Sequence, residues 1–348
     1  MSMSRFRFVR LPTLPAGVAC ALALAASADV AHAQLDLNGK TVTIHVGGGA
    51  GGGVDIFART FAQHLPRHLP GEPQVVVSNM PGNGGIEAVQ FTYNVAAKDG
   101  TAIGTTNAGP IVEPLMGGAF AGNYDITRFR WIGSLLKGDT VCAVWHGSRT
   151  KSLEDARRQD VAMASTGATS SPMRSALLMN ALIGTRFKPI AGFDGGSALL
   201  ALERGEVEGI CNQLASQRTT RPQWLKEGKL KPIVFVAMSV DPEFSTVPRA
   251  YHLVKDDSDR QVLELYLLPW EFNHSFMLPP GAPGATLSAW RAAFDKAVNE
   301  PAYLADAAKR LQRIEPRSGQ EVQGLVDKLY ATPKEIVDRT NAVTSSQK

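Results

Sequence analysis

The residues best arranged for chemistry in this sequence are backbone amides rather than reactive side chains. Residues 47–55 read GGGAGGGVD, with six glycines around one alanine. Glycine loses more backbone freedom on folding than any other residue, so such a run needs a reason. It follows an apolar stretch and precedes a helical pattern, which places its N–H groups where a helix N-terminus binds an anion. The sequence predicts an anion site in this loop.

A nucleotide is the first alternative ligand for this loop. Gly47, Gly49 and Gly52 fit the dinucleotide pattern G-x-G-x-x-G. That pattern also needs an acidic residue about 20 positions on, at the end of the second strand, and here residues 77–79 read VSN. A P-loop needs Gly-Lys-Ser/Thr after the glycines, whereas residues 53–55 read GVD. Neither nucleotide motif is complete.

Asp55 closes the loop with a carboxylate. Two carboxylates in contact repel each other, so we expect Asp55 to organise the loop and its water rather than to touch an anionic ligand directly. Helix N-capping is the alternative role for this side chain.

A second glycine-rich loop follows the next predicted strand. Residues 79–85 read NMPGNGG and precede another helical pattern. Loops at the carboxyl ends of neighbouring strands line one crevice, which is where open α/β sheets bind ligands. We therefore expect further ligand contacts in this loop, and also just after the third strand at Asn107.

A hydroxyl-rich turn in the middle of the chain offers a facing surface. Residues 164–172 read ASTGATSSP, and Pro172 is placed to open a helix. One hydroxyl is expected to cap that helix, and the others exceed this need. The remaining hydroxyls could hold a second carboxylate, and Asp194 in a later turn is either a helix cap or a further ligand contact.

The sequence lacks the arrangements that catalysis requires. No G-x-S-x-G elbow surrounds any serine, and most histidines are isolated. His64 and His68 share one helical face but lack the glutamate of H-E-x-x-H, so we expect a solvated helix end rather than zinc. We predict no catalytic residue, no metal and no cofactor.

Strands and helices alternate along most of the chain, which is typical of parallel sheets wound by right-handed crossovers. The pattern forms two α/β units, which we expect to be joined by extended hinges near residues 138–142 and 234–242. Strands are predicted at 41–46, 75–77, 102–105, 142–145, 161–164, 188–190 and 209–211. Helices are predicted at 56–69, 86–95, 172–182, 196–204, 286–299, 302–311 and 320–329.

The N-terminus has the features of a secretory signal peptide. Three arginines precede an apolar run, and residues 31–33 read AHA, an A-x-A cleavage signal. The apolar run is short for a membrane span, and Cys20 lies inside it rather than in a lipidation motif. We expect residues 1–33 to be removed and the protein to be periplasmic.

The net charge and the cysteine content bear on the partners of the protein and on disulfide formation. Removing residues 1–34 takes away three arginines and one aspartate, which lowers the net charge from +4 to +2. Lysine and arginine are scattered rather than clustered, which argues against nucleic acid as a partner. Cys142 and Cys211 remain, and the sequence leaves open whether they pair or stay as buried thiols.

The ordered set of motifs resembles the Bug family, the TctC-type extracytoplasmic solute receptors of tripartite tricarboxylate transporters. The likeness runs through GGGAGGGVDIFARTFAQHL, VVVSNMPGNGG, NVAAKDGTAIGT, ASTGATSSP, ALLALERGEVEG and LPPGAP, and covers nearly the whole chain after the signal peptide. The sequence departs from the family pattern at four places. Gly47 and Gly48 replace a proline-aromatic pair, Met80 replaces an arginine, Asn83 replaces an alanine, and Gly192-Phe193 lies where tyrosine is common.

The resemblance implies a two-lobed α/β periplasmic-binding-protein fold, in which each lobe is a wound sheet flanked by helices. One lobe would comprise residues 34–140 and 238–348, and the other residues 141–237. It implies a monomer that captures a small organic carboxylate and delivers it to the membrane subunits of a transporter. Carried over to this sequence, the resemblance implies ligand contacts in three places: Gly49, Ala50, Gly51, Gly52 and Gly53 with Asp55 in the first loop, Pro81, Gly82, Asn83 and Gly84 in the second loop, and Ser165, Thr166, Thr169 and Ser170 in the hydroxyl-rich turn. Docking on a membrane sensor kinase is the alternative, and a nucleotide-dependent enzyme is the less favoured one. The departures leave the carboxylate undefined.

Overall fold

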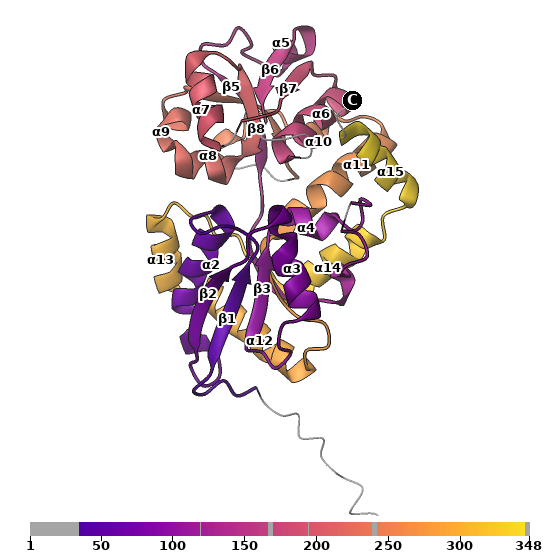
Figure 1. Cartoon of the computed structure of the whole chain (residues 1–348). Coiled ribbons are helices and arrows are strands. Elements are labelled where there is room, and N and C mark those ends of the chain that lie inside the picture. Colours follow the sequence, from indigo (N-terminus) through magenta and orange to yellow (C-terminus); the bar gives the residue numbers. More distant parts are fainter. Residues whose placement is uncertain (1–34, 119, 166–169, 194, 239–241, 345–348) are drawn as a thin grey trace, which may run out of the picture. The chain divides into compact units, whose positions relative to one another are not determined.

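The computed structural model describes residues 35–118, 120–165, 170–193, 195–238 and 242–344. The predicted signal peptide therefore lies outside the described residues. The described chain forms two sheets, each flanked by helices (Figure 1). Within the described residues, no helix combines the length and apolarity needed to cross a bilayer.

The first sheet has six strands, with β1 near one edge between two parallel partners. Alternate residues of β1, Val42, Ile44 and Val46, are buried, as a strand packed on one face requires. The spatial order is β11 (Arg317–Ser318), β4 (Arg130–Leu136), β10 (Asn273–Leu278), β3 (Ala102–Thr106), β1 (Thr41–Val46) and β2 (Gln74–Asn79).

Helices on this sheet come from both ends of the chain, as the indigo and yellow segments of Figure 1 show. Phe61 of α2 links them: its ring centroid lies 5.0 Å from that of Phe276, 5.4 Å from that of Phe294 and 5.8 Å from that of Tyr303. The helices are α2 (Gly53–His64), α3 (Ile86–Asn94), α4 (Ala108–Val112), α12 (Gly284–Val298), α13 (Pro301–Lys309) and α14 (Gly319–Tyr330).

The second sheet has five strands and is built from the middle of the chain. The spatial order is β7 (Phe187–Ile190), β6 (Val161–Ala164), β8 (Gly209–Gln213), β5 (Thr140–Trp145) and β9 (Leu230–Val236). The helices of this part are α5 (Leu153–Arg158), α6 (Ser171–Ile183), α7 (Gly195–Arg204), α8 (Leu214–Thr220), α9 (Pro222–Lys226) and α10 (Ala250–Leu253). Two further helices, α11 (Asp257–Leu267) and α15 (Lys334–Thr344), pack on each other and on α6.

The sheets are mixed rather than wholly parallel. β1 pairs in parallel with β2 and β3, and β6 pairs in parallel with β7 and β8, as the strand–helix–strand pattern predicts. β10 runs antiparallel to both β3 and β4, and β5 runs antiparallel to both β8 and β9. β5 is the first strand after the chain leaves the first sheet, and β10 is the first strand after it returns. Local strand–helix–strand patterns predict parallel neighbours, but these two strands pair with partners distant in sequence.

The chain passes between the sheets at two places. Residues 137–139 join β4 to β5, where Gly138 N donates to Trp270 O at 2.6 Å and Leu214 N donates to Asp139 O at 2.8 Å. After β9 the chain returns to that strand at Pro248, since Phe235 N donates to Pro248 O at 2.8 Å. The hinge positions and lobe boundaries given by the sequence remain predictions.

A disulfide links β5 to β8. Cys142 and Cys211 are direct partners in the antiparallel register, both are buried, and their sulfurs are bonded. Their Cα atoms are 3.9 Å apart, although the residues lie 69 positions apart in sequence. The structure thus resolves the question that the sequence left open in favour of a pair.

Removing this disulfide is expected to lower the free energy of unfolding by about 4 kcal/mol, the chain-entropy value for a loop of this length. The measurement is urea denaturation of the oxidised wild type and of the double variant Cys142→Ala, Cys211→Ala. Reducing agent should destabilise the wild type and leave the variant unchanged. Equal stabilities of the oxidised wild type and the variant would contradict the expectation.

Candidate functional site

The main candidate site is a cleft of about 880 Å³ lined by elements of both sheets. That volume lies within the range of small-molecule sites, about 300–1,000 Å³. From the first sheet and its helices come Gly53, Val54, Gly84, Asn107, Gly109, Trp270, Asn273 and His274. From the second come Thr140, Ser165, Ser170, Ser171, Pro172, Ala198, Leu199, Ile210, Cys211, Asn212, Gln213, Gln217, Arg221 and Leu230.

Two helix N-termini border this cleft. Gly53 and Val54 begin α2, and Ser171 and Pro172 begin α6. The first N–H groups of a helix have no partner inside the helix and carry partial positive charge. Both helix starts therefore direct backbone N–H groups toward the cleft, but α6 offers fewer of them, because Pro172 has no N–H and Met173 N donates to Ser170 Oγ.

The glycine loop before α2 is held by Asp55. This carboxylate is 2% exposed and accepts hydrogen bonds from Gly51 N at 2.8 Å, Asn79 Nδ2 at 2.8 Å and Arg59 Nε at 3.0 Å. Burial by itself raises the pKa of Asp55, but the hydrogen bonds from Arg59, Gly51 and Asn79 outweigh it and lower the pKa below its usual value. Asp55 is thus buried and ionised, and its hydrogen bonds hold the loop in place.

N-capping by Asp55, the alternative role, is not what the structure has. The N-cap of α2 is Gly52, which makes no side-chain cap bond, and Asp55 lies within the first turn. Asn79, the first residue of the second loop, connects the two loops. Its Nδ2 also donates to Gly48 O of the first loop at 3.0 Å, and its Oδ1 accepts from Arg59 Nη2 at 2.8 Å. Sequence reasoning missed Asn79 and Arg59, although Arg59 follows Asp55 by one helical turn.

The two glycine loops touch backbone to backbone. A Cβ at Gly85 would lie 2.7 Å from Gly47 O, and a Cβ at Gly47 would lie 3.0 Å from Gly85 Cα. Gly51 is needed for another reason, since its φ of +76° is one that residues with a Cβ rarely adopt. Part of the glycine run therefore serves the loops themselves rather than the ligand.

The predicted ligand contacts divide into three groups. The residues that line the main cleft are Gly53, Gly84, Asn107, Ser165 and Ser170. The residues that do not line it are Gly49, Ala50, Gly51, Gly52, Asp55, Pro81, Gly82 and Asn83. Thr166, Thr169 and Asp194 lie outside the described residues.

Several of the cleft residues also have a local structural role. Ser170 is the N-cap of α6 and accepts from Met173 N at 3.4 Å, which confirms that one hydroxyl of the turn caps this helix. Asn107 caps α4 by accepting from Gly109 N at 3.0 Å. Ser165 Oγ donates to Ile190 O at 3.2 Å. These bonds fix the side chains that face the cleft.

A smaller pocket of about 260 Å³ adjoins the cleft. It shares Gly84, Gly109, Ser171 and Trp270 with the cleft and adds Asn83. Tyr266 lines it, and the hydroxyls of Tyr266 and Ser175 of α6 lie 2.9 Å apart. The shared residues make the pocket an extension of the same space.

Sequence reasoning missed several polar cleft residues in the second half of the chain. Arg221 lines the cleft, and its guanidinium carbon lies 5.8 Å from the centroid of the Trp224 ring. His274 has a φ of +52°, a strained value for a residue with a Cβ, which is a feature common at functional sites. Burial lowers the pKa of His274 to about 4, so its imidazole is neutral at pH 7.

No Asp or Glu is among the described residues that line the main cleft. An anion therefore meets backbone donors, hydroxyls, amides and one arginine without a described carboxylate beside it. This composition suits a negatively charged or neutral polar ligand and disfavours a cation.

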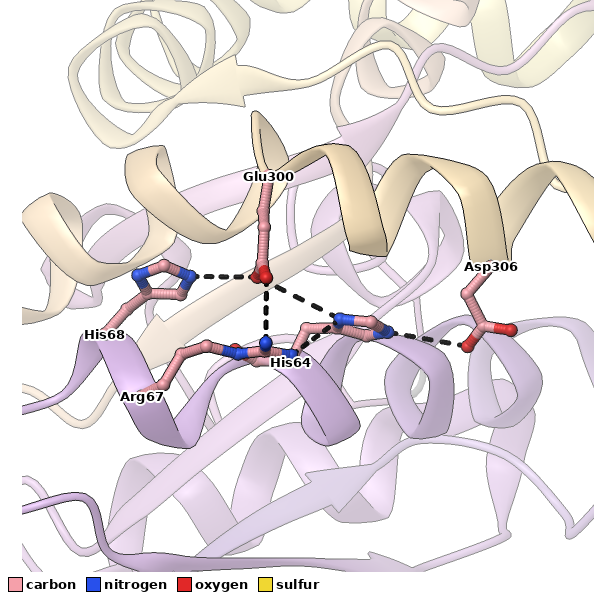
Figure 2. A network of polar contacts seen from close by, with 5 residues as sticks. All are labelled: His64, Arg67, His68, Glu300 and Asp306. Carbon is pink, nitrogen blue, oxygen red and sulfur yellow. Dashed lines mark hydrogen bonds and ion pairs between the residues drawn. The ribbon is translucent and has the colours of Figure 1, made fainter.

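His64 and His68 lie apart from the cleft, at the end of α2 and in the 3-10 turn after it (Figure 2). Glu300, just before α13, accepts from His68 Nε2 at 3.0 Å and from Arg67 Nη1 at 2.9 Å, and His64 Nε2 lies 3.5 Å from Asp306 Oδ2. The expected solvated helix end is wrong, because both histidines are largely buried against α13. No group of three or more His, Cys, Asp or Glu residues in the described chain is placed to hold a metal.

Comparison with known proteins places the fold. A scan against protein-family models found no match, and a search of curated proteins found none. Many solved structures match the chain, and three of those that share the fold show the range of identity and of bound ligand. A TctC solute binding protein from Polaromonas, without ligand, has a TM-score of 0.66 at 19% identity, covering 86% of this chain and 98% of its own.

The other two were solved with ligands. MatC from Rhodopseudomonas palustris, with bound malate, has a TM-score of 0.61 at 22% identity over 88% of this chain and 99% of its own. A second protein of that organism, with adipate, has a TM-score of 0.64 at 18% identity over 87% of this chain and 97% of its own. The predicted two-lobed α/β fold of TctC-type solute-binding proteins is confirmed.

Asp55 makes the stability of the protein depend on pH in a defined direction. Its lowered pKa means that the stabilisation is present above about pH 4, the usual value for an unfolded aspartate, and is lost as the pH falls through the folded pKa. The difference in free energy of unfolding between wild type and Asp55→Asn should be constant from pH 7 to pH 5 and then shrink toward pH 3. Urea denaturation across this range measures it. A difference that grows on acidification would contradict the assignment.

Substitutions at Gly53 and Gly49 distinguish a ligand bound in the cleft from a ligand bound along the whole glycine loop. A Cβ at either position would meet no heavy atom within 4 Å, but only Gly53 lines the cleft. Gly53→Val should weaken binding of the ligand by roughly tenfold or more, equivalent to about 1.4 kcal/mol. Gly49→Val should bind like the wild type. Titration calorimetry is the measurement, and equal loss in both variants would instead place the anion on the whole loop, as the sequence predicts.

Proposed function

We propose that this chain is a periplasmic solute-binding protein that captures a small organic carboxylate between its two lobes and delivers it to the membrane subunits of a tripartite tricarboxylate-type transporter. The observation that carries the proposal is the cleft at the N-termini of α2 and α6. Each helix N-terminus favours an anion by about 0.3–1 kcal/mol, and by up to about 2 kcal/mol where it is partly buried. Two such ends on one cleft fit a ligand with more than one carboxylate.

The fold and the known ligands of similar proteins support this assignment. Two solved structures with this fold hold malate and adipate, both of them dicarboxylates. The cleft also offers hydroxyls at Thr140, Ser165 and Ser171 and a guanidinium at Arg221. We propose that the carboxylate oxygens accept from these donors and from the helix N–H groups.

The structure also fits a periplasmic location for this protein. The Cys142–Cys211 disulfide requires an oxidising compartment to form and persist. The periplasm is such a compartment, and residues 1–33 have the features of an export signal. We propose export, removal of this segment, and binding by a monomer in the periplasm.

The proposed mechanism is closure of the lobes on the ligand. A carboxylate docks first at the start of α2, and the start of α6 then closes over it by movement at the two connections between the sheets. The closed pair of lobes presents a surface to the transporter that the open pair lacks. No bond of the ligand is made or broken.

A ligand panel tests the proposal. The protein is exported from a Gram-negative host, purified without reducing agent, and unfolded and refolded to strip any bound ligand. It is then melted with mono-, di- and tricarboxylates, aromatic acids, amino acids and nucleotides. A carboxylate at about 100 times its Kd should stabilise the folded state by about 2.7 kcal/mol, raise Tm by several degrees, and be recovered unchanged. A shift with a nucleotide alone, or with a compound that is consumed, would contradict the proposal.

A further inference from the structure

Gln217 in α8 is a buried amide that faces the cleft without a partner in the described chain. The side chain is 5% exposed, it lines the cleft, and neither Nε2 nor Oε1 makes a hydrogen bond. An unsatisfied buried polar group costs about 1–3 kcal/mol, and native proteins leave few of them. A side chain in this position is arranged to bind something that enters the cleft.

Two further unpartnered groups lie on the other side of the same cleft. Asn273 is fully buried, and its Nδ2 has no partner, while its Oδ1 accepts from His274 N at 3.1 Å. His274 is 7% exposed, and its Nδ1 has no partner. Both residues begin β10 of the first sheet, whereas Gln217 belongs to the second. The cleft therefore holds neutral hydrogen-bonding groups from both lobes.

Lining the cleft is what distinguishes Gln217 from other buried amides. Gln312 is also 5% exposed and also has no partner for Nε2 or Oε1. It lines neither the cleft nor the adjoining pocket. An unpartnered amide alone does not identify a site, and Gln312 supplies a matched control.

The hydrogen-bonding groups of an amide restrict the chemical class of the ligand. Nε2 donates hydrogen bonds and Oε1 accepts them, so a ligand that satisfies both must offer an acceptor and a donor. A carboxylate offers only acceptors. The ligand must therefore carry an O–H or N–H group in addition to its carboxylate.

The charges around the cleft favour a hydroxyl over an ammonium group. A buried ammonium needs a carboxylate partner, and no Asp or Glu is among the described residues that line the main cleft, while Glu113 lines only the adjoining pocket. The described lining residues include one arginine, Arg221, which would repel an ammonium group. A hydroxyl donates to Oε1 without adding charge.

We propose that Gln217, opposite Asn273 and His274, recognises a ligand hydroxyl, and that the substrate class is therefore hydroxycarboxylates. The inference rests on the proposed function and adds the substrate class to it. The hydroxyl donates to Gln217 Oε1, and an oxygen of the same ligand accepts from Nε2. Asn273 Nδ2 donates to the same ligand from the opposite side.

Matched pairs that differ by one hydroxyl test this inference by titration calorimetry. The pairs are malate and succinate, citrate and tricarballylate, and mandelate and phenylacetate. In the pair whose skeleton fits the cleft, the hydroxylated member should bind at least tenfold more tightly to the wild type. Equal affinity for both members of every pair that binds would overturn the inference while leaving the proposed function standing. Failure of every carboxylate to bind would instead contradict the proposed function.

Variants assign the discrimination to Gln217. Gln217→Leu should weaken binding of the hydroxylated acid at least tenfold and leave binding of the acid without the hydroxyl nearly unchanged. The ratio of the two affinities should then be close to one. Gln312→Leu should keep the wild-type ratio. If Gln217→Leu does not fold by circular dichroism, Gln217→Asn withdraws the amide by one methylene and should also reduce the ratio. A wild-type ratio in the folded Gln217 variant would overturn the inference.

Discussion

The first lobe's side of the cleft depends on one buried negative charge. Asp55 is ionised in a place where burial alone would favour its neutral form, and the bonds from Arg59, Asn79 and Gly51 reverse that preference. Through Asn79 the same charge also fixes the start of the second loop. The backbone contact between Gly47 and Gly85 then sets how closely the loops approach, and hence where the N-terminus of α2 lies.

The negative charge of Asp55 is paired with Arg59 and does not reach the main cleft. No Asp or Glu is among the described residues that line this cleft. The positive potential of the cleft comes from backbone groups at two helix ends and from Arg221, and His274 is neutral at pH 7. Backbone donors are fixed by the fold and lose no side-chain entropy on binding. They attract carboxylates as a class, while amides such as Gln217 can discriminate among them.

The two strands that follow the passages of the chain between the sheets, β5 and β10, help to form the cleft. β5 and β10 each enter a sheet from the other lobe and run antiparallel to their neighbours. β10 consequently begins at the cleft with Asn273 and His274, and the disulfide anchors β5 to β8, whose residues Cys211 and Asn212 also line the cleft. The strands that join the lobes thus contribute directly to the surface between them.

The sequence by itself determined the local units and the resemblance in fold. Strands 41–46 and 161–164 were placed to the residue, and most of the predicted helices were placed within a few residues, because apolar periodicity and glycine or proline at the ends are local signals. Strands β4, β9 and β10 and helices α5, α11 and α15 were among the elements that were not predicted. It also indicated Gly53, Gly84, Asn107, Ser165 and Ser170, which lie in the segments that connect a strand to the next helix. Only the tertiary structure decided that β10 is antiparallel, that Cys142 pairs with Cys211, and that Gln217, Arg221, Asn273 and His274 meet at the cleft. Those contacts join residues far apart in sequence, and no local pattern encodes which distant segments become neighbours.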